Sequence, residues 1–327
     1  MPGKVGPDEL LEVVFGRTGT DDETVIQGPA DGEDAAAIDW PGGTLVVSSD
    51  PISLAASQVG TLGVHIACND VAASGADPRW LTTVIMLPTS AGDDSTLEAI
   101  TADLDATARE VGATIVGGHS EYVDALERPL ISLTAMGATE AFLPTGGARP
   151  GDSVLLTKAA GLEGTAILAA DFGDGLEVDD ETVAAASGFL AEISVVPDAR
   201  IVREYATAMH DPTEGGVTVG LLELARASGV RLAVDREAIP IRPETRQLCA
   251  AAGVDPLRIF GSGALLATVP TAAVEDCLEA LADAGLEAAE IGTVREGEPG
   301  LELDGETVTG PIEDDLYPLW AAVDAED

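Results

Sequence analysis

The stretch that decides the fold is TLGVHIACNDVAASGADPRWLTTVIML, residues 61–87. Residues 61–74 carry small and apolar side chains at helical spacing, which predicts a helix buried on most of its sides. Residues 81–87 have the apolar, β-branched composition of a strand. Asn69 and Asp70 interrupt the apolar helix. Because a buried charge must be paired or bound to a metal, this pair is a candidate functional site.

Strand-like and helix-like runs alternate on both sides of this stretch. A turn-rich seam at residues 144–152 separates two domains, 1–148 and 149–327. The sequence therefore predicts an α+β fold with a mixed α/β domain in each half. In the first half we expect strands at 44–49, 113–116 and 130–136 and a capped helix at 94–111. In the second we expect strands at 153–157, 231–234, 264–269 and 288–294, helices at 165–171, 181–193, 216–228 and 272–284, and a docked final segment at 313–327.

The charge of the chain is strongly one-sided. Its 58 acidic and 16 basic side chains give a net charge of −42 over 327 residues, which argues against nucleic-acid binding through a basic surface. The acids are spread over all segments, and Lys4 and Lys158 are the two lysines. Such a surface is screened at molar salt, where the Debye length is about 3 Å, so we interpret it as adaptation to a salty cytosol. An ordinary acidic protein with a solvated surface is the alternative.

The remaining composition favours a folded cytoplasmic protein. Hydrophobic residues make up 46% of the chain and the mean hydropathy is +0.20, which provides material for cores and excludes disorder as the main state. Three cysteines without a CxxC pair and three histidines cannot build a disulfide framework or a Cys/His zinc cage. No apolar run approaches the ~18 residues of a membrane span, and we expect no secretory signal.

Several short segments place carboxylates or amides beside glycine or other small residues, most of them at the end of an apolar run. Loops and strand ends of this kind bring backbone N–H groups and carboxylate oxygens to one rim, which suits phosphates bridged by a hard cation such as Mg²⁺. Asp34, Asp50 and Asp70 are the candidate metal ligands, provided that they converge in space. The segments are GEDAA (32–36), SSD (48–50), CND (68–70), GGHSE (117–121) and HDPTEGG (210–216).

Each segment also has a purely structural interpretation. Asp34 is typical of a turn, and Asp50 of the end of a strand. Gly117 and Gly118 allow either close backbone approach to a ligand or a plain turn. Asp211, like the glutamate at 214, is also a suitable cap for the helix that follows.

The second half adds a weaker anion-binding signal. Residues 161–165 follow a predicted strand and enter a helix, as an anion-holding loop does, and Lys158 beside them is a candidate for contact with phosphate. The sequence lacks GxxxxGK[ST], GxGxxG, HExxH and GxSxG, so the classes of protein that these motifs define are disfavoured.

Taken together and in order, these segments resemble the PurM-like superfamily. It contains aminoimidazole ribonucleotide synthetase, selenophosphate synthetase, thiamine-monophosphate kinase and the hydrogenase-maturation carbamoyl dehydratase, HypE. The resemblance covers nearly the whole chain and is greatest to archaeal proteins related to the synthetase or to HypE. The motifs that carry it are GEDAAAID (32–39), SSDPIS (48–53), NDVAASGADPRW (69–80), GGHSEY (117–122), LLTKAAGLEGTAILA (155–169), HDPTEGG (210–216) and GSGALL (261–266).

The resemblance implies an N-terminal domain that forms a barrel with its twin across a dimer, and a C-terminal α/β domain that closes over an ATP cleft. Family members transfer the γ-phosphoryl group to an oxygen or selenium nucleophile, so positioning and charge neutralisation by metal carry the catalysis. By motif position the implied roles are Asp34, Asp50 and Asp70 for magnesium; Asn69, Gly117, Gly118, Ser120 and Lys158 for ATP; and Asp211, His119 and Glu121 for the reacting end.

The chain also departs from individual family members. The carbamoyl dehydratase uses a cysteine at its extreme C-terminus, whereas Cys277 lies inside a predicted helix here. Glu214 stands where the dehydratase commonly has arginine, and His119 stands where thiamine-monophosphate kinase has an acid.

The sequence thus predicts a homodimeric, cytoplasmic, ATP- and Mg²⁺-dependent enzyme. It would transfer a phosphoryl group to a small-molecule amide, carboxylate or phosphate ester, with no role for nucleic acid or membrane. The alternatives are an ATP-binding maturation or assembly factor of HypE type without the cysteine chemistry, and a metal-dependent hydrolase that uses the same acids.

Overall fold

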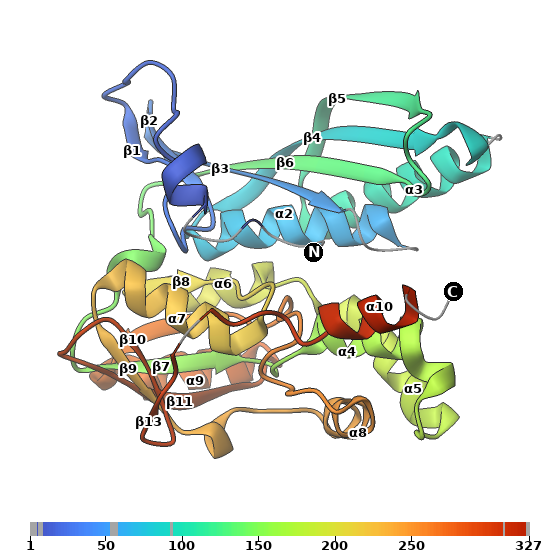
Figure 1. Cartoon of the computed structure of the whole chain (residues 1–327). Helices are drawn as coiled ribbons and strands as arrows, with labels where there is room; N and C mark the ends of the chain where they lie inside the picture. The colour runs from blue at the N-terminus through green and yellow to red at the C-terminus, as the bar shows by residue number, and fades with distance from the viewer. Residues whose placement is uncertain (1–4, 6–8, 53–57, 92–93, 310, 325–327) are drawn as a thin grey trace. The chain divides into compact units, whose positions relative to one another are not determined.

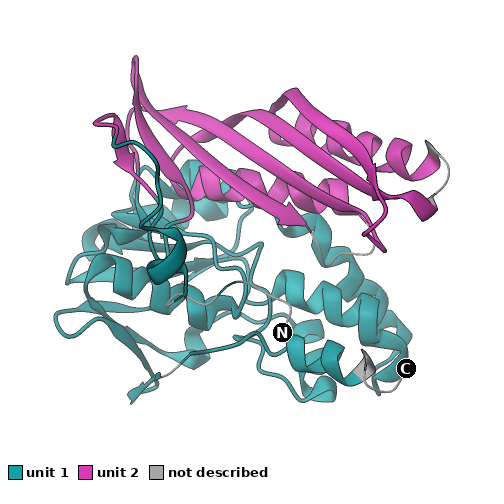
Figure 2. Ribbon diagram, turned by 45° about the horizontal axis from the view of Figure 1, so that its top comes forward, with its two compact units in different colours: residues 1–21, 29–33, 143–327 teal, residues 22–28, 34–142 magenta. Residues whose placement is uncertain are grey.

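The computed structural model describes the whole chain except residues 1–4, 6–8, 53–57, 92–93, 310 and 325–327. It contains two compact units, coloured separately in Figure 2. The N-terminal unit comprises residues 22–28 and 34–142, and the C-terminal unit comprises residues 1–21, 29–33 and 143–327. In the described part of the chain, no helix combines the length and the apolar character needed to cross a membrane.

The N-terminal unit is a six-stranded sheet in the order β1-β2-β3-β6-β4-β5, with two long helices on one side (Figure 1). All neighbours pair antiparallel except β4 and β5, which are parallel because a helix connects them. The elements are β1 (Val25–Gln27), β2 (Ala36–Trp40), β3 (Gly43–Ile52), α2 (Val59–Ala73), β4 (Asp77–Pro88), the short η2 (Thr89–Ala91), α3 (Asp94–Val111), β5 (Thr114–Val123) and β6 (Leu130–Thr139).

This sheet has one dry face. Side chains alternate between the faces of a strand, and on β6 Ile131, Leu133 and Ala135 are fully buried on the side that faces α2. The residues between them, like Val47 on β3 and Val84 on β4, are half-buried on the opposite face. No described helix of the N-terminal unit covers that opposite face.

The C-terminal unit is a seven-stranded sheet in the order β13-β12-β9-β11-β7-β10-β8. Its strands are β7 (Asp152–Thr157), β8 (Ala208–His210), β9 (Arg231–Val234), β10 (Leu266–Pro270), β11 (Ala288–Arg295), β12 (Gly300–Leu303) and β13 (Glu306–Thr307). Its helices are α4 (Leu162–Ile167), α5 (Asp180–Ser187), α6 (Val196–Val202), α7 (Gly216–Ser228), α8 (Pro243–Ala252), α9 (Val274–Asp283) and α10 (Tyr317–Asp324). Short 3₁₀ or π turns are η1 (Leu10–Val14), η3 (Thr145–Gly147), η4 (Leu168–Phe172), η5 (Gly173–Gly175), η6 (Gly188–Glu192), η7 (Arg236–Ala238) and η8 (Thr271–Ala273).

Helix α7 is central to the core of this unit. Its Leu221 and Leu224 pack with Leu156 of β7, Leu232 of β9 and Leu266 of β10, all of them nearly or fully buried. Complete burial of each such side chain contributes roughly 1.5–3 kcal/mol. The core therefore fixes α7, and with it the loop of residues 211–216 that opens the helix.

Two passages of the chain between the units are fastened side by side on the C-terminal unit. Glu33 Oε2 accepts a hydrogen bond of 3.2 Å from the backbone N–H of Thr145. Ser228, at the end of α7, donates to the carbonyl of Thr145 and accepts from the N–H of Ala148. The residues just before Asp34 and just after Phe142 are thus held together.

The α+β fold predicted from the sequence is confirmed, and most long elements lie where the patterns place them. The helix predicted at 61–74 is α2, that at 94–111 is α3, and that at 216–228 is α7. One local expectation was wrong: residues 117–121 are not a loop or turn after a short strand, because β5 continues through them to Val123. The helix expected at 181–193 is also broken into α5 and η6.

Candidate functional site

Two carboxylates of the N-terminal unit meet on one serine. Ser48 Oγ lies 2.7 Å from Asp70 Oδ2 and 3.0 Å from Asp50 Oδ2. Ser48 and Asp70 are almost fully buried. A hydroxyl has one hydrogen and can donate it to one carboxylate at a time, so two acidic groups converge on a donor that satisfies one of them.

Local structure explains this meeting. Ser48 and Asp50 are two residues apart on β3, so both side chains point to the face that α2 covers. Asp70 and the completely buried Asn69 lie near the end of α2, whose small residues bring its backbone close to the sheet. The helix predicted from the apolar run and the strand predicted at 44–49 together create the pair of acids.

The charge of Asp70 is felt by its neighbour Cys68. Burial raises the pKa of the Cys68 thiol to about 12, and the Asp70 carboxylate adds to that rise. The site is therefore a region of negative potential in a dry setting. A hard divalent cation fits its donors, because Mg²⁺ binds one or two protein carboxylates and takes its other oxygens from water and phosphate.

Asp34 lies outside the strands and does not complete a cluster of three with Asp50 and Asp70 in the described residues. It lies two residues before β2, whose Ala36 pairs with Val47, and the antiparallel register runs from there toward Ser49 and Asp50. Within the described residues, no group of three or more His, Cys, Asp or Glu side chains is arranged to hold a metal ion. The structure thus brings Asp50 and Asp70 together and leaves the participation of Asp34 a prediction.

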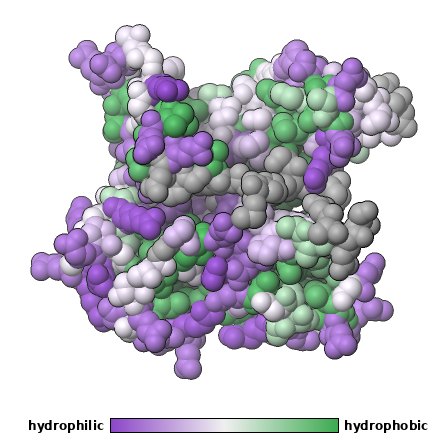
Figure 3. All heavy atoms as spheres, viewed as in Figure 1, coloured by the Kyte–Doolittle hydropathy of each residue, from purple (hydrophilic) through white to green (hydrophobic). Residues whose placement is uncertain are grey.

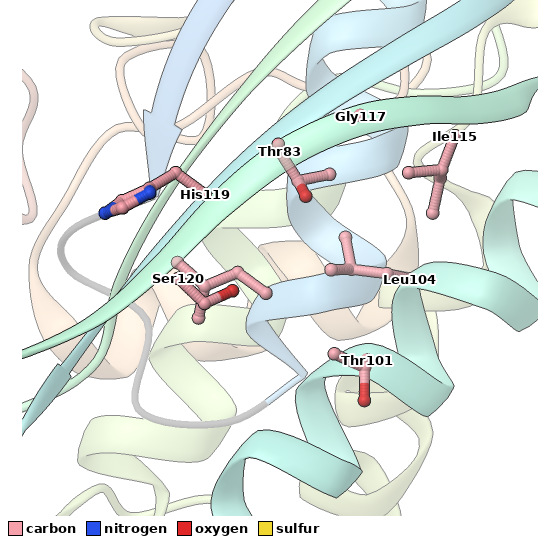
Figure 4. Close-up of a pocket in the computed structure, with 9 residues that line it drawn as sticks. Thr83, Thr101, Leu104, Ile115, Gly117, His119 and Ser120 are labelled. Atoms are coloured by element: carbon pink, nitrogen blue, oxygen red, sulfur yellow. The ribbon is translucent and has the colours of Figure 1, made fainter.

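The Gly-Gly-His-Ser segment lines a pocket of about 290 Å³ at the β5 edge of the same sheet (Figure 4). Gly118 has no room for a side chain, since a Cβ there would lie 2.1 Å from the carbonyl oxygen of Thr83 on β4. A Cβ on Gly117 would meet nothing within 4 Å. Close strand pairing therefore explains Gly118, while Gly117 leaves open space at the pocket.

His119 and Glu121 form a pair of their own on β5. His119 Nε2 lies 3.6 Å from Glu121 Oε2, and the two side chains are 66% and 50% exposed. His119 pairs with Val84 and Glu121 pairs with Met86 across β4 and β5. Both therefore lie on the face of the sheet opposite to that of Ser48 and Asp50. Strands β6 and β4 also lie between β3 and β5, which corresponds to three strand spacings or about 14 Å. Within one chain, the His119–Glu121 pair is therefore separate from Asp50 and Asp70.

Asp211 belongs to the C-terminal unit, where it follows β8 and is 2% exposed. The turn after it depends on glycine: Gly216 has φ +61°, and a Cβ there would lie 2.4 Å from the carbonyl oxygen of Ile259. The neighbouring His210 contacts Glu223 of α7 at 3.1 Å. The loop that carries Asp211 is thus fixed at both of its ends.

Lys158 is occupied within the C-terminal unit. Its ammonium group donates to the carbonyls of Glu192 (3.0 Å) and Ser194 (2.6 Å) and forms an ion pair of 3.2 Å with the fully buried Asp198. Burial raises the pKa of Asp198, and the charge of Lys158 opposes that rise. Two hydrogen bonds and one ion pair thus engage the ammonium group within the unit, so this geometry lends no support to the predicted contact with phosphate.

One residue of the site escaped the sequence analysis. The sequence alone gives no role to Ser48, although this serine lies in the SSD segment (48–50). Its signal is the two-residue spacing from Asp50, which puts both side chains on one face of a strand.

These two units define the protein as one of PurM-like architecture. The chain belongs to the AIR synthase related protein family: the family's N-terminal domain matches residues 32–139 and its C-terminal domain matches residues 149–304. The family predicted from the sequence motifs is thereby confirmed.

Carbamoyl dehydratases are among the curated relatives of the chain. The chain is 35% identical over 274 residues to the carbamoyl dehydratase HypE of Azotobacter vinelandii, covering 80% of this chain and 78% of the relative. It is 32% identical over 262 residues to HypE of Escherichia coli K12, covering 78% and 76%.

Solved structures agree with this assignment. The crystal structure of the hydrogenase maturation protein HypE in complex with ATP has a TM-score of 0.71 and 26% identity, covering 96% of this chain and 97% of that one. The AaThiL structure complexed with AMPPCP and TMP has a TM-score of 0.74 and 25% identity, covering 88% and 92%.

Proposed function

We propose that the protein is an ATP-dependent enzyme that transfers a phosphoryl group to a small-molecule amide, carboxylate or phosphate ester. The observation that carries the proposal is the convergence of Asp50 and Asp70 on Ser48. It occurs in a family with relatives that are carbamoyl dehydratases, and similar folds have been solved with ATP or with AMPPCP and TMP.

In this proposal the acids hold magnesium and the triphosphate. The cation, when bound, neutralises the charge that develops on the transferred phosphoryl group. Ser48 donates its one hydroxyl hydrogen to Asp70 or to Asp50, and the buried setting strengthens the electrostatic effect of the carboxylates because little water screens it. The residues assigned to the metal are Asp34, Asp50 and Asp70, and those assigned to ATP are Asn69, Gly117, Gly118, Ser120 and Lys158. Of these, Lys158 would have to leave its contacts with Glu192, Ser194 and Asp198 to reach a phosphate.

The reacting end is assigned to Asp211, His119 and Glu121. A carboxylate or an imidazole within hydrogen-bonding reach of the acceptor would take its proton during transfer. His119 Nε2 and Glu121 Oε2 already lie 3.6 Å apart, so the carboxylate is placed to orient the imidazole ring.

We also propose that the enzyme works as a homodimer. Strand β5 ends the sheet of the N-terminal unit and exposes Val116 and Tyr122 to about half of their full extent. An edge strand with exposed apolar side chains is a template for another strand. A second copy pairing here would also cover the half-buried outer face of the sheet, which supports a shared barrel.

The acidic surface supports a protein that works at high salt in a reducing cytoplasm. Figure 3 shows hydrophilic side chains spread over much of the face in view, and the net charge is −42. The many negative charges repel one another, and salt screens this repulsion. All three cysteines are free and buried.

A HypE-like maturation or assembly factor that binds ATP without cysteine chemistry is the second candidate. Burial raises the pKa of Cys249 to about 12 and that of Cys277 to about 11. A thiolate is the reactive form of cysteine, so these residues suit packing and not catalysis.

The test is ATP turnover by the purified protein in high KCl with Mg²⁺ and pooled small metabolites. We expect ADP formation that Asp70→Asn abolishes and that Asp39→Asn, an exposed acid of the same unit, leaves unchanged. ATP binding without turnover in every metabolite pool would favour the assembly factor. Failure to bind ATP would overturn both candidates.

A further inference from the structure

A second group of acids lies in the C-terminal unit, outside the proposed site. It contains Glu163 of α4, Glu214 of the loop at 211–216, and Asp314 of the C-terminal segment, by which we mean residues 311–324. Glu163 is 6% exposed and Asp314 is 2% exposed, while Glu214 is half-buried.

Backbone hydrogen bonds tie these three elements to one strip of chain, residues 257–262. Gly164 N donates to Phe260 O at 2.9 Å, and Gly261 N donates to Thr213 O at 3.0 Å. Asp315 N donates to Arg258 O at 2.9 Å. The acids are therefore brought together by the main chain and not by chance side-chain rotamers.

Asp314 has the contacts of an ionised carboxylate. Its Oδ2 accepts from the N–H of Gly215 at 2.8 Å, and its Oδ1 accepts from the N–H of Leu316 at 3.0 Å. Gly215 directly precedes α7, where the helix dipole favours a negative group. Through Asp314 the C-terminal segment is docked on the loop that carries Asp211.

Glu163 has the surroundings of a protonated carboxyl. Within the described structure, Glu163 Oε2 and the neighbouring Ser262 Oγ, which is 1% exposed, have no hydrogen-bond partner. Among the described residues, the charged group that acts on the pKa of Glu163 is Glu214, and those that act on the pKa of Asp314 are Glu163 and Glu214. All of them are acidic. Burial raises the pKa of both Glu163 and Asp314 to about 7.

Aromatic packing holds the rest of the segment in place. Phe260 makes edge contacts with Tyr317 and Trp320, whose centroids lie 5.9 and 6.2 Å from its own. Trp320 Nε1 donates to Asp171 Oδ2 at 2.9 Å. The groups that face the acids from the packed elements are Glu214, Ser262 and Tyr317, followed by the Arg258–Asp315 ion pair at 3.0 Å.

We propose that the C-terminal segment is a latch held closed by one proton. While Glu163 carries the proton, the buried group contains one negative charge fewer and Asp314 stays docked on Gly215. When the proton passes to solvent water, Glu163 and Asp314 become like charges in a dry setting and the segment loosens. A loosened segment uncovers the amide at the start of α7, beside the loop of Asp211. The latch does not depend on the proposed phosphoryl transfer.

The direction of the pH effect follows from the proton on Glu163. Burial raises the pKa of Glu163 from 4.5 and that of Asp314 from 3.8, in each case to about 7, so the docked state binds protons on this pair more tightly than a state in which the pair is solvated. Docking therefore weakens as the pH rises from about 3.8 to about 7 and is constant above that.

Hydrogen exchange of the amides of Leu316 and Trp320 measures this docking, with the amides of β7 reporting global opening. After correction for intrinsic rates, we expect protection in the native chain to fall at least about tenfold from about pH 5 to about pH 7.5. Glu163→Gln should make this dependence less steep, and the part that remains belongs to Asp314. Glu313→Gln removes an exposed charge from the same segment and should leave it unchanged.

Two outcomes overturn the latch: protection that does not change with pH in the native chain, or an equally steep fall in Glu163→Gln. Should Glu163→Gln fail to fold, Glu214→Gln takes its place, because it removes a half-buried charge that raises the pKa of Glu163. A slope in folded Glu214→Gln as steep as in the native chain would also refute the proposal. Because no ATP is present, the result is independent of the enzyme assay.

Discussion

Substitution by alanine at Gly117 and at Gly118, which are adjacent on β5, should change the free energy of unfolding in opposite directions. At Gly118 a Cβ would lie 2.1 Å from Thr83 O and 2.7 Å from Thr83 Oγ1. The oxygen belongs to the backbone of the neighbouring strand, so no side-chain rotation relieves the overlap. At Gly117 the same atom would enter open space.

The magnitudes follow from these surroundings. Gly118→Ala forces β4 and β5 apart, and overpacking of this kind costs about 1–3 kcal/mol. Gly117→Ala adds no contact and restricts the unfolded chain, which stabilises by about 0.4–1 kcal/mol. We therefore expect the free energies of unfolding of the two variants to differ by about 1.4–4 kcal/mol.

Urea unfolding at high KCl, followed by far-ultraviolet circular dichroism, measures this difference. The two variants differ by one methyl group each at neighbouring positions, so each is the control for the other. Free energies of unfolding that agree within about 0.5 kcal/mol would refute the packing argument, since independent surface changes already vary by that much.

Three further results are expected. Asp70→Asn should abolish stimulation of ATP binding by Mg²⁺ while Ser48→Ala weakens it, as titration calorimetry would show; unchanged Mg²⁺ dependence in both would remove the acids from the site. Lys158→Met leaves Asp198 buried without its partner and should destabilise by about 3–5 kcal/mol in urea unfolding, and a loss below about 1 kcal/mol would contradict the ion-pair geometry. Because burial raises the pKa of Cys68 to about 12, its thiol should resist alkylation near pH 8 until the protein unfolds, and rapid labelling of the native protein would show that it is not buried.

The fold could be predicted from the sequence where a segment carries a long periodic pattern. Residues 61–74 and 216–228 became α2 and α7 because their apolar residues serve one core each. Short or uniformly polar elements could not be found this way. Helix α8 (Pro243–Ala252) was missed, since few of its side chains are buried. The Gly-Gly pair suggested a turn, whereas strand pairing against Thr83 is what requires glycine.

The site was predictable only in part, because spacing along the chain does not give distances across a sheet. Asn69 and Asp70 were recognisable as polar residues in a buried helix, and their meeting with Asp50 follows from strand alternation. The separation of His119 from Asp50 could not be predicted, since it depends on the strand order β3-β6-β4-β5. Glu163 and Asp314 are 151 positions apart in the sequence. No local pattern in either segment predicts that the two carboxyls are buried near each other.

The hydrogen bond between Glu33 and Thr145 holds together the two chain segments that flank residues 34–142. These residues are therefore an insertion whose two ends lie close to each other. The equivalent segment of a relative could replace residues 34–142 without a change in the length of either connection. Exchange of whole N-terminal units between family members is therefore an economical way to build chimaeras. In such chimaeras the latch and the aromatic packing at the C-terminus would stay with their own host.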